Sequence, residues 1–514
     1  MVETDVLEEG QETIPGTGTV QIGVSRPPLP VTDLPTPEEV FKIKGKMTPG
    51  KVVRYVLGPS MIALGVSIGS GEWLIGPFNV GTKGFVGILW VVLVSAVLQV
   101  FYNVELARFT IATGESPAIG FGRVPPGFWL WIPLAVFMYW LAFIWGGWAS
   151  GAGQSLFVLW QGHNPTGGEV TVSRGLGAGL LFLVMGIVLF GRKISRTMEI
   201  ANWVMVAFIL FSVVSLVVLI VPASFSASAW VALVTPAVPP AGSTATDLGA
   251  LAGFTATASG VNYFIISYYR DKGYGMGHRV GYIAALVGGK QEKLLASGMT
   301  FPADEKNTRL WKRWFRYLLI DQWGVFFTGA ILGMMMPVIL VGYLAQATGV
   351  PPTRAGMPVY AATQIGILFP GSFLVTWALI AGFLILFSTQ MVVFEALVRQ
   401  FVDGAHAMST RFRKLTREDP RRFYYPFMFA LAAVISLIVI FGFNPLDLVS
   451  ISANFSNLAS LIIPFAVIYL NRQLPAPARM KWWSYIVLLL NVVFFGFFFI
   501  NFVADLIGEP LVKF

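Results

Sequence analysis

Long apolar stretches alternate with short polar breaks along most of the chain. Eleven such stretches stand out, at 54–79, 85–107, 128–160, 175–190, 198–222, 248–269, 317–346, 366–398, 424–442, 447–470 and 482–507. Most of them approach the roughly 20 residues that an α-helix needs to cross the hydrocarbon core of a bilayer. The pattern therefore predicts an all-α polytopic membrane protein with about eleven transmembrane helices.

The composition supports this prediction, because 55% of the 514 residues are hydrophobic and only 12% are charged. Soluble domains carry about 25% charged residues. The chain has no cysteine, which excludes disulfides and thiolate metal sites. Residues 1–46 differ from the rest, since they are acidic and poor in large apolar side chains, and we expect a disordered cytoplasmic tail there. A transmembrane transporter domain is expected at 47–514.

The basic residues are distributed unevenly between the two ends of the predicted helices. If the N-terminus is cytoplasmic, 31 of the 35 Lys and Arg residues fall on that side, ten of them between Arg270 and Arg316, a segment that includes a predicted basic loop at 271–316. Cytoplasmic loops of membrane proteins carry such an excess. We therefore expect a multi-pass protein of the cell membrane whose C-terminus lies on the opposite side. The positive charge reflects orientation in the lipid bilayer and not binding to nucleic acid.

Glu72 is the one acidic residue placed deep inside an apolar stretch, in GVSIGSGEWLIGP. A charge at that depth costs at least a few kcal/mol and usually faces a cavity or a pathway. Gly65, Gly69 and Gly71 weaken the helix by roughly 1 kcal/mol each relative to alanine, so we predict a break near Gly69–Gly71. Glu72 would then begin a second half-helix, where the helix dipole favours an anion and the preceding free carbonyls could coordinate a cation. The alternative is a glutamate that is protonated or satisfied by packing.

Other charged and titratable residues suggest less. Glu105 beside Arg108, Asp321, and Glu395 near Arg399 are expected to be solvated or paired at the interface. The three histidines are assigned to connections between the stretches; they are His163, His278 and His406. With no histidine or cysteine in a predicted span and no P-loop spacing in GGKQEK, we do not expect an enzyme.

The sixth stretch contains a second polar interruption, in ALAGFTATASGVNYFIISYYRDKG. Its Ser259 and Gly260, followed by Asn262, echo the segment around Glu72 in the first stretch. Two interrupted helices in corresponding positions of two halves are typical of inverted-repeat secondary transporters, whose site lies at the midplane between the breaks. The two halves would be 54–222 and 248–471, with an extra helix at 482–507.

Six segments match one transporter family in order and spacing. They are GPSMIALGVSIGSGEW (58–73), LARFTIATGES (106–116), GRKISRTMEIANWV (191–204), TASGVNYFIISYYRDKG (257–273), FSTQMVVFEALVRQFVDG (387–404) and LIIPFAVIYLNR (461–472). Together they resemble the Nramp (natural resistance-associated macrophage protein) divalent metal transporters. The resemblance implies a leucine-transporter-type 5+5 inverted repeat with broken first and sixth helices, and transport by alternating access.

The residues at the family's ligand positions are different in this chain. Its first-helix Asp, Pro and Asn correspond to Gly69, Ser70 and Glu72, so the carboxylate is displaced by three residues. Its sixth-helix Met-Pro-His-Asn corresponds to 259–262, which lacks the thioether and the histidine. Oxygen ligands alone suit harder ions such as Mg²⁺, Ca²⁺ or Mn²⁺.

The family's proton pathway has no counterpart among the corresponding residues. The acidic positions of its third helix correspond to Gly147 and Ser150, and the ninth stretch has no arginine. The comparison therefore leaves proton coupling doubtful.

Two functions from different classes remain open. The first is a secondary transporter of a divalent metal cation. The residues of its predicted metal site are Glu72, Gly69, Ser70, Ser259, Asn262, Gln390, Ser456 and Asn457, together with position 256, which is Ala256 between two threonines. For the polar helix residues among them, an interhelical hydrogen bond is an equally good explanation.

The second function is an organic-solute carrier of the same fold, for an amine or an amino acid. IGSGEW also resembles the Gly-Ser-Gly motif of amino-acid carriers, and Glu72 would suit an organic cation. A transporter-like sensor without flux would leave no trace in the sequence. No cofactor is expected; the expected partners are the lipid bilayer and the transported cation or solute.

Overall fold

The computed structural model describes residues 19–20, 28–45, 47–69, 71–190, 194–282, 295, 297–417, 419–509 and 511–512. Within these residues, ten helical segments are long and apolar enough to cross a membrane, and a bent pair at 245–272 makes eleven. The predicted eleven spans are therefore confirmed, and the protein is a multi-pass membrane protein.

Most of the spans are single helices. They are α5 (Leu89–Thr113), α9 (Glu169–Leu189), α10 (Ile194–Ile220), α18 (Phe373–Met408), α20 (Arg421–Phe441), α21 (Pro445–Arg472) and α22 (Trp482–Leu506). Four spans are composite. They are α3 (Pro59–Ser67), η2 (Gly71–Ile75) and α4 (Gly76–Lys83); α7 (Phe128–Phe143) and α8 (Gly147–Gln161); α12 (Ala245–Phe254), η3 (Ser259–Val261) and α13 (Tyr263–Lys272); and α15 (Glu305–Leu319), η4 (Ile320–Phe327) and α16 (Thr328–Thr348).

Shorter elements connect or flank the spans. They are β1 (Thr19–Val20), β2 (Leu29–Pro30), α1 (Pro37–Val40), α2 (Pro49–Lys51), η1 (Val52–Val56), α6 (Pro117–Phe121), α11 (Ala223–Val234), α14 (Gly277–Val280), η5 (Met357–Val359), α17 (Tyr360–Leu368), α19 (Thr410–Thr416) and η6 (Ala476–Ala478). The two strands pair antiparallel.

Several spans are longer than their apolar stretches. The seventh begins at Glu305 rather than near residue 317, because α15 is strongly amphipathic: Trp311 and Trp314 are buried while Arg309 is exposed. A hydropathy pattern detects only the part of a helix that faces hydrocarbon. For the same reason α18 runs to Met408 rather than 398. His406 therefore lies in the last turn of this helix, and the prediction that it lies in a connection is wrong.

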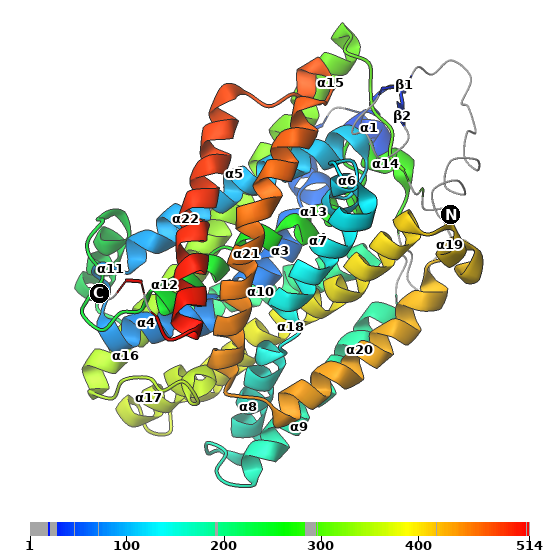
Figure 1. The fold of residues 1–514 in the computed structure, drawn as a ribbon. Coiled ribbons are helices and arrows are strands. Elements are labelled where there is room, and N and C mark those ends of the chain that lie inside the picture. The colour runs from blue at the N-terminus through cyan, green and yellow to red at the C-terminus, as the bar shows by residue number, and fades with distance from the viewer. Residues whose placement is uncertain are drawn as a thin grey trace.

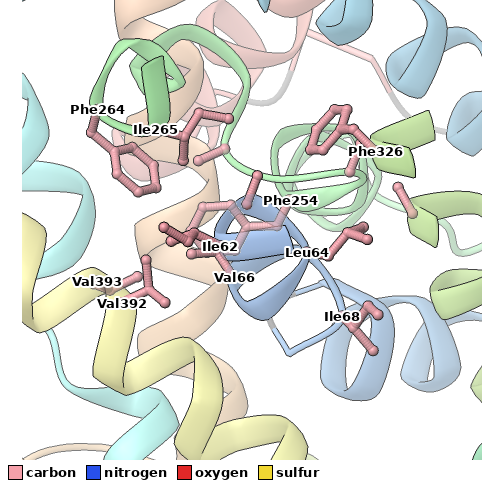
Figure 2. Packing of buried hydrophobic residues seen from close by; sticks show 14 of the residues in the cluster. Ile62, Leu64, Val66, Ile68, Phe254, Phe264, Ile265, Phe326, Val392 and Val393 are labelled. Atoms are coloured by element: carbon pink, nitrogen blue, oxygen red, sulfur yellow. The ribbon is translucent and has the colours of Figure 1, made fainter. Parts of the chain in front are cut away.

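The broken first span lies inside the helix bundle (Figure 1). Its most apolar window is 94% buried within the protein, whereas the corresponding windows of α10 and α22 are 39% buried. α10 and α18 pack against α3, and α21 packs against α12 and η3. Figure 2 shows the apolar packing around α3, where Ile62 and Val66 lie near Val392 and Val393 of α18. The two broken spans are therefore shielded from lipid by the others.

Residues 28–45, here called the N-terminal strap, pack against the start of α15. The backbone N–H of Thr32 donates to the Thr300 carbonyl at 2.8 Å, and that of Leu34 donates to Asn307 Oδ1 at 2.8 Å. The Trp314 indole donates to the Pro35 carbonyl at 2.9 Å. This part of the predicted disordered tail is folded, because its few apolar residues and its acidic groups find partners on α15. Residues 1–18, 21–27 and 46 lie outside the described part.

The predicted basic loop at 271–316 is only partly a loop. Its first residues end α13 and form α14, and its last twelve belong to α15. Most of the apolar segment 281–289, which the sequence leaves as a surface helix or a packed plug, falls in 283–294, outside the described residues.

Candidate functional site

The first span breaks where its glycines predict. α3 ends at Ser67, a turn covers 68–69, and helical structure resumes at Gly71. Both glycines at the break allow close approach of other chains: a Cβ at Gly71 would lie 2.5 Å from the Phe254 carbonyl oxygen, and one at Gly69 would lie 2.3 Å from the Ile385 carbonyl oxygen. Ser70 lies outside the described residues. Glycine is thus needed here for packing between spans as well as for the break.

The sixth span breaks opposite the first. α12 ends at Phe254, and the helix axis bends by 53° before α13. Two residues of the break have left-handed backbone conformations, Ala256 with φ of +68° and Ser259 with φ of +38°. Such conformations cost of order 1–3 kcal/mol each outside glycine and cluster at functional sites. They leave the backbone groups of 255–258 without the regular pattern of a helix.

Glu72 lies between the two breaks, in the first turn of η2 as predicted, and its side chain is completely buried. Its Oε1 accepts hydrogen bonds from the Ser67 hydroxyl at 3.1 Å and from the Ala256 backbone N–H at 3.3 Å. Its Oε2 is buried and has no hydrogen-bond partner among the described residues. One carboxylate oxygen therefore joins the two broken spans.

A second polar cluster surrounds the sixth-span break, centred on Gln99 of α5. Gln99 Oε1 accepts from the Ser259 backbone N–H at 3.1 Å and from Asn262 Nδ2 at 2.9 Å, and Gln99 Nε2 donates to the Thr255 carbonyl. Asn262 Oδ1 accepts from the Ala258 backbone N–H at 2.8 Å. Gln99 and Asn262 thus satisfy the irregular backbone of the break, as backbone buried at membrane depth requires.

The predicted residues of the tenth span join this second cluster. The Ser259 hydroxyl donates to Asn457 Oδ1 at 2.9 Å and lies 3.0 Å from the Ser456 hydroxyl. Asn457 Nδ2 donates to the Gly249 carbonyl at 2.9 Å. These side chains tie α21 to α12 and to the break of the sixth span, so their interhelical hydrogen bonds account for them without a ligand.

Gln390 and Gly69 both lie where α18 packs against another span: Gln390 contacts α8, and Gly69 lies against Ile385 and Thr389 of α18. Gln390 Oε1 accepts from the Ala149 backbone N–H of α8 at 3.1 Å, and its Nε2 has no partner among the described residues. The neighbouring Thr389 hydroxyl lies 3.0 Å from the Gly65 carbonyl and 3.2 Å from the Val66 carbonyl, at the end of α3. No hydrogen bond between Gln390 and Glu72 is present in the described part.

The structure therefore divides the predicted site. It brings Glu72 and Ala256 into direct contact, and it gathers the polar residues of the sixth and tenth spans into a separate cluster. Sequence reasoning missed Ser67 and Gln99 as functional side chains. Ser67 was detectable as a hydroxyl directly before the break, whereas the role of Gln99 depends on where α5 packs. Among the described residues, no group of three or more His, Asp or Glu side chains converges.

Asp321, which the sequence suggests is solvated or paired at the interface, is instead fully buried at the start of α3. Its carboxylate accepts from the backbone N–H groups of Gly58 and Ser60 at 3.3 and 3.1 Å and from the Ser60 hydroxyl at 2.7 Å. The Tyr269 hydroxyl of α13 donates to it as well. A carboxylate is stable there because it satisfies the free N–H groups of the helix and complements its dipole.

The other two predicted acidic pairs form, but inside the protein. Glu105 pairs with Arg108 at 2.7 Å, and Glu395 pairs with Arg399 at 2.7 Å. All four side chains are buried. Asp271, which also pairs with Arg399, extends the second pair to α13. Each of these charges is compensated by a partner on its own helix, and Arg399 has a second partner on α13.

Comparison with known proteins supports the fold. Neither a protein-family model nor a curated protein matches the chain. Solved structures of a manganese transporter from Eremococcus coleocola do match. Two mutants of it are each 15% identical, with 91% of both chains covered and TM-scores of 0.54 and 0.52. A complex of the same transporter with an aromatic bis-isothiourea substituted compound is 13% identical, with 92% of both chains covered and a TM-score of 0.51.

At this level of identity the likeness establishes the architecture. The predicted leucine-transporter-type 5+5 arrangement with broken first and sixth helices is confirmed, and the chain has the fold that the resemblance to the Nramp family implies.

Proposed function

We propose that this protein is a secondary transporter that carries a divalent metal cation across the membrane by alternating access, with Glu72 binding the cation. The observation that supports this most is the buried Glu72 carboxylate, one oxygen of which bridges the two broken spans while the other has no partner among the described residues. A site between two broken helices at mid-membrane depth is where carriers of this architecture bind their substrates.

The donors near Glu72 favour a hard cation. The groups that could complete a coordination shell are the Ser67 hydroxyl and the backbone carbonyls of the two breaks, all of them oxygen ligands. Among the described residues, no histidine joins Glu72 in a group that could hold a metal ion. Oxygen ligands suit Mg²⁺, Ca²⁺ and Mn²⁺ better than softer metals, and the solved structures of the same fold are named as manganese transporters.

A single carboxylate offers one negative charge to a dication, so the binding is expected to be weaker than in a site with several carboxylates. Weak binding is compatible with transport, because a substrate must leave the site as well as enter it. The second cluster, around Gln99 and Asn262, would position the break rather than hold the ion.

Alternating access requires that each end of the site be closed by contacts that can be broken. At the end of the site that lies nearer the N-terminal strap, Asp321 holds the start of α3. Lys272 donates to the Leu57 carbonyl at 2.8 Å, and Tyr274 donates to the Val56 carbonyl at 3.0 Å. All three lie on the sixth or seventh span or directly after it. Outward movement of α3 from these partners would open the site toward this end.

At the other end, a different set of polar contacts closes the site. The Trp73 indole of η2 donates to the Pro358 carbonyl at 3.0 Å. Arg354 pairs with Asp247 at the start of α12 and with Asp447 at the start of α21, at 2.8 and 3.0 Å. Glu72 itself is completely buried in this structure. Separation of these pairs would open the second path.

The proposed orientation places the N-terminal strap in the cytoplasm, since 31 of the 35 basic residues would then lie on the inner side. The cell membrane is the proposed location. Transport is proposed to occur without obligatory proton movement, because the residues at the family's third-helix acidic positions are Gly147 and Ser150.

Uptake into proteoliposomes tests the proposal. The full-length protein would be reconstituted, and entry of Mn²⁺, Mg²⁺ and Ca²⁺ would be measured with a pH dye inside the vesicles. We expect flux of at least one ion without acidification, and loss of that flux in Glu72→Gln. The matched control is Glu305→Gln, which makes the same change on a side chain that is 85% exposed.

Two results would overturn the proposal. Undiminished metal flux in Glu72→Gln would remove the carboxylate from the site. No flux of any of the three ions, together with calorimetric binding of an amine or an amino acid that Glu72→Gln abolishes, would instead identify an organic-solute carrier of the same fold.

A further inference from the structure

A groove of about 330 Å³ lies between η1 and the first turns of α10, away from the Glu72 site. One end of it is polar and is formed by Arg54, Arg196 and Glu199. The rest is apolar and is formed by Val53, Ile200, Trp203 and Val204. The groove lies close to the start of the first span, because η1 directly precedes α3.

The charges at the polar end do not balance. Arg196 donates to Glu199 at 2.9 Å, and Lys272 donates to the same carboxylate oxygen at 2.8 Å. Arg54 is exposed and forms no ion pair with any described residue. Two cations therefore share one carboxylate, and Arg54 and Arg196 both line the open space, so this end of the groove carries an excess of positive charge. This end of the groove is suited to an anion that accepts hydrogen bonds from guanidinium, such as a phosphate ester.

The apolar part continues along the lipid-facing side of α10. Ile200, Trp203 and Val204 are 51%, 37% and 69% exposed, and the same side of the helix carries Phe211 and Val218, which are 64% and 74% exposed. These positions follow one another at helical spacing on a span of high hydropathy, so they contact acyl chains and not water. An amphiphile with its head among the arginines would place its tail along this side.

We propose that this groove binds an anionic phospholipid, with the phosphate between Arg54 and Arg196 and an acyl chain against Trp203 and Val204. The proposal commits to a lipid rather than to free phosphate, because the apolar surface continues directly from the cationic end. Basic pockets between membrane helices bind anionic headgroups in the same way. The proposal does not depend on what the protein transports.

The position of the groove gives the lipid a connection to the first span. Glu199 accepts from Lys272, and Lys272 also donates to the Leu57 carbonyl, immediately before α3. A phosphate that draws Arg196 away from Glu199 leaves this carboxylate to Lys272 alone and strengthens that pair. A bound anionic lipid is therefore expected to favour the state in which the start of α3 is held in place.

Lipid binding to the full-length protein in detergent tests the inference. Native mass spectrometry would compare dissociation of phosphatidylglycerol and phosphatidylcholine from the unmodified protein, Arg54→Gln and Arg196→Gln. Each arginine near a membrane surface strengthens anionic-lipid binding by about fivefold, so each substitution is expected to weaken phosphatidylglycerol binding by that factor and to leave phosphatidylcholine unchanged. Arg309→Gln is the control, since Arg309 is exposed on α15, outside the groove.

A second measurement does not depend on altered arginines. Brominated phosphatidylglycerol in nanodiscs should quench the fluorescence component that is lost in Trp203→Phe, and an excess of inorganic phosphate should not relieve this quenching. Phosphatidylglycerol affinity that is the same in both arginine variants as in the unmodified protein would overturn the site. Relief of quenching by inorganic phosphate would show that the groove binds a free anion and would overturn the lipid assignment.

Discussion

Replacement of Asp321 by asparagine tests whether this buried carboxylate holds the first span closed. Asp321 accepts from the backbone N–H groups of Gly58 and Ser60, from the Ser60 hydroxyl and from the Tyr269 hydroxyl. These partners join the start of α3 to η4 and α13. Asparagine preserves the size of the side chain but has only one oxygen. Its amide nitrogen, which cannot accept a hydrogen bond, would replace an oxygen that now accepts from the Ser60 N–H, the Ser60 hydroxyl and the Tyr269 hydroxyl.

The expected cost follows from the donors left without an acceptor. A buried polar group that loses its hydrogen-bond partner costs about 1–3 kcal/mol, and bonds to charged groups are at the upper end. Asparagine can still accept on one oxygen, and Ser60 and Tyr269 can partly reorient, so we expect a loss of about 2 kcal/mol. That energy corresponds to a roughly 30-fold increase in the population in which the start of α3 has separated from η4.

The absence of cysteine from the chain allows a direct assay. A single cysteine at Ala63 of α3, which is 1% exposed, reacts with a maleimide only when this helix moves away from its neighbours. The labelling rate in Asp321→Asn is expected to be about 30 times that of the parent Ala63→Cys protein. Asp447→Asn is the matched control, because Asp447 belongs to the ion pairs at the opposite end. Equal labelling rates in the parent and in Asp321→Asn would refute the reasoning.

Two further predictions concern the break and the strap. A Cβ at Gly69 would lie 2.3 Å from a backbone oxygen of α18, so Gly69→Ala should lower the stability by about 1–3 kcal/mol in thermal unfolding. Gly324→Ala is the control and should not lower it, because a Cβ at Gly324 would have nothing within 4 Å. Equal unfolding midpoints in the two variants would contradict this prediction. Hydrogen bonds from Asn307 and Lys306 hold the pKa of Asp33 below its usual range. The stabilisation of the folded strap by Asp33 is therefore complete above the ordinary pKa of about 3.9, and it is lost as the pH falls through the lower pKa of the folded state. The protection of the strap amides, measured as the exchange rate relative to the intrinsic rate at each pH, should therefore fall from pH 5 to pH 3 in the unmodified protein, and a loss of protection of the same size in Asp33→Asn would contradict the assignment.

Much of the architecture was predictable because it rests on local patterns. A run of about 20 apolar residues can only be stable in lipid as a helix, so the hydropathy pattern alone determines the eleven spans. The break before Glu72 was predictable for the same kind of reason, since three glycines within seven residues weaken a helix whatever surrounds it. The ends of spans were less predictable, because amphipathic extensions such as α15 leave no apolar signal.

The partners of the polar residues depend on contacts between distant parts of the chain. Glu72 is 184 residues from Ala256, and Ser60 is 261 residues from Asp321, so no local pattern states that either pair meets. The sequence identified Glu72 as the unusual charge, because its cost at membrane depth follows from its position alone. Only packing of the helices decided that Ser259 and Asn457 satisfy each other, that Asp321 holds the start of α3, and that one oxygen of Glu72 faces no described donor, since a hydrogen bond depends on three-dimensional distance and not on separation along the chain.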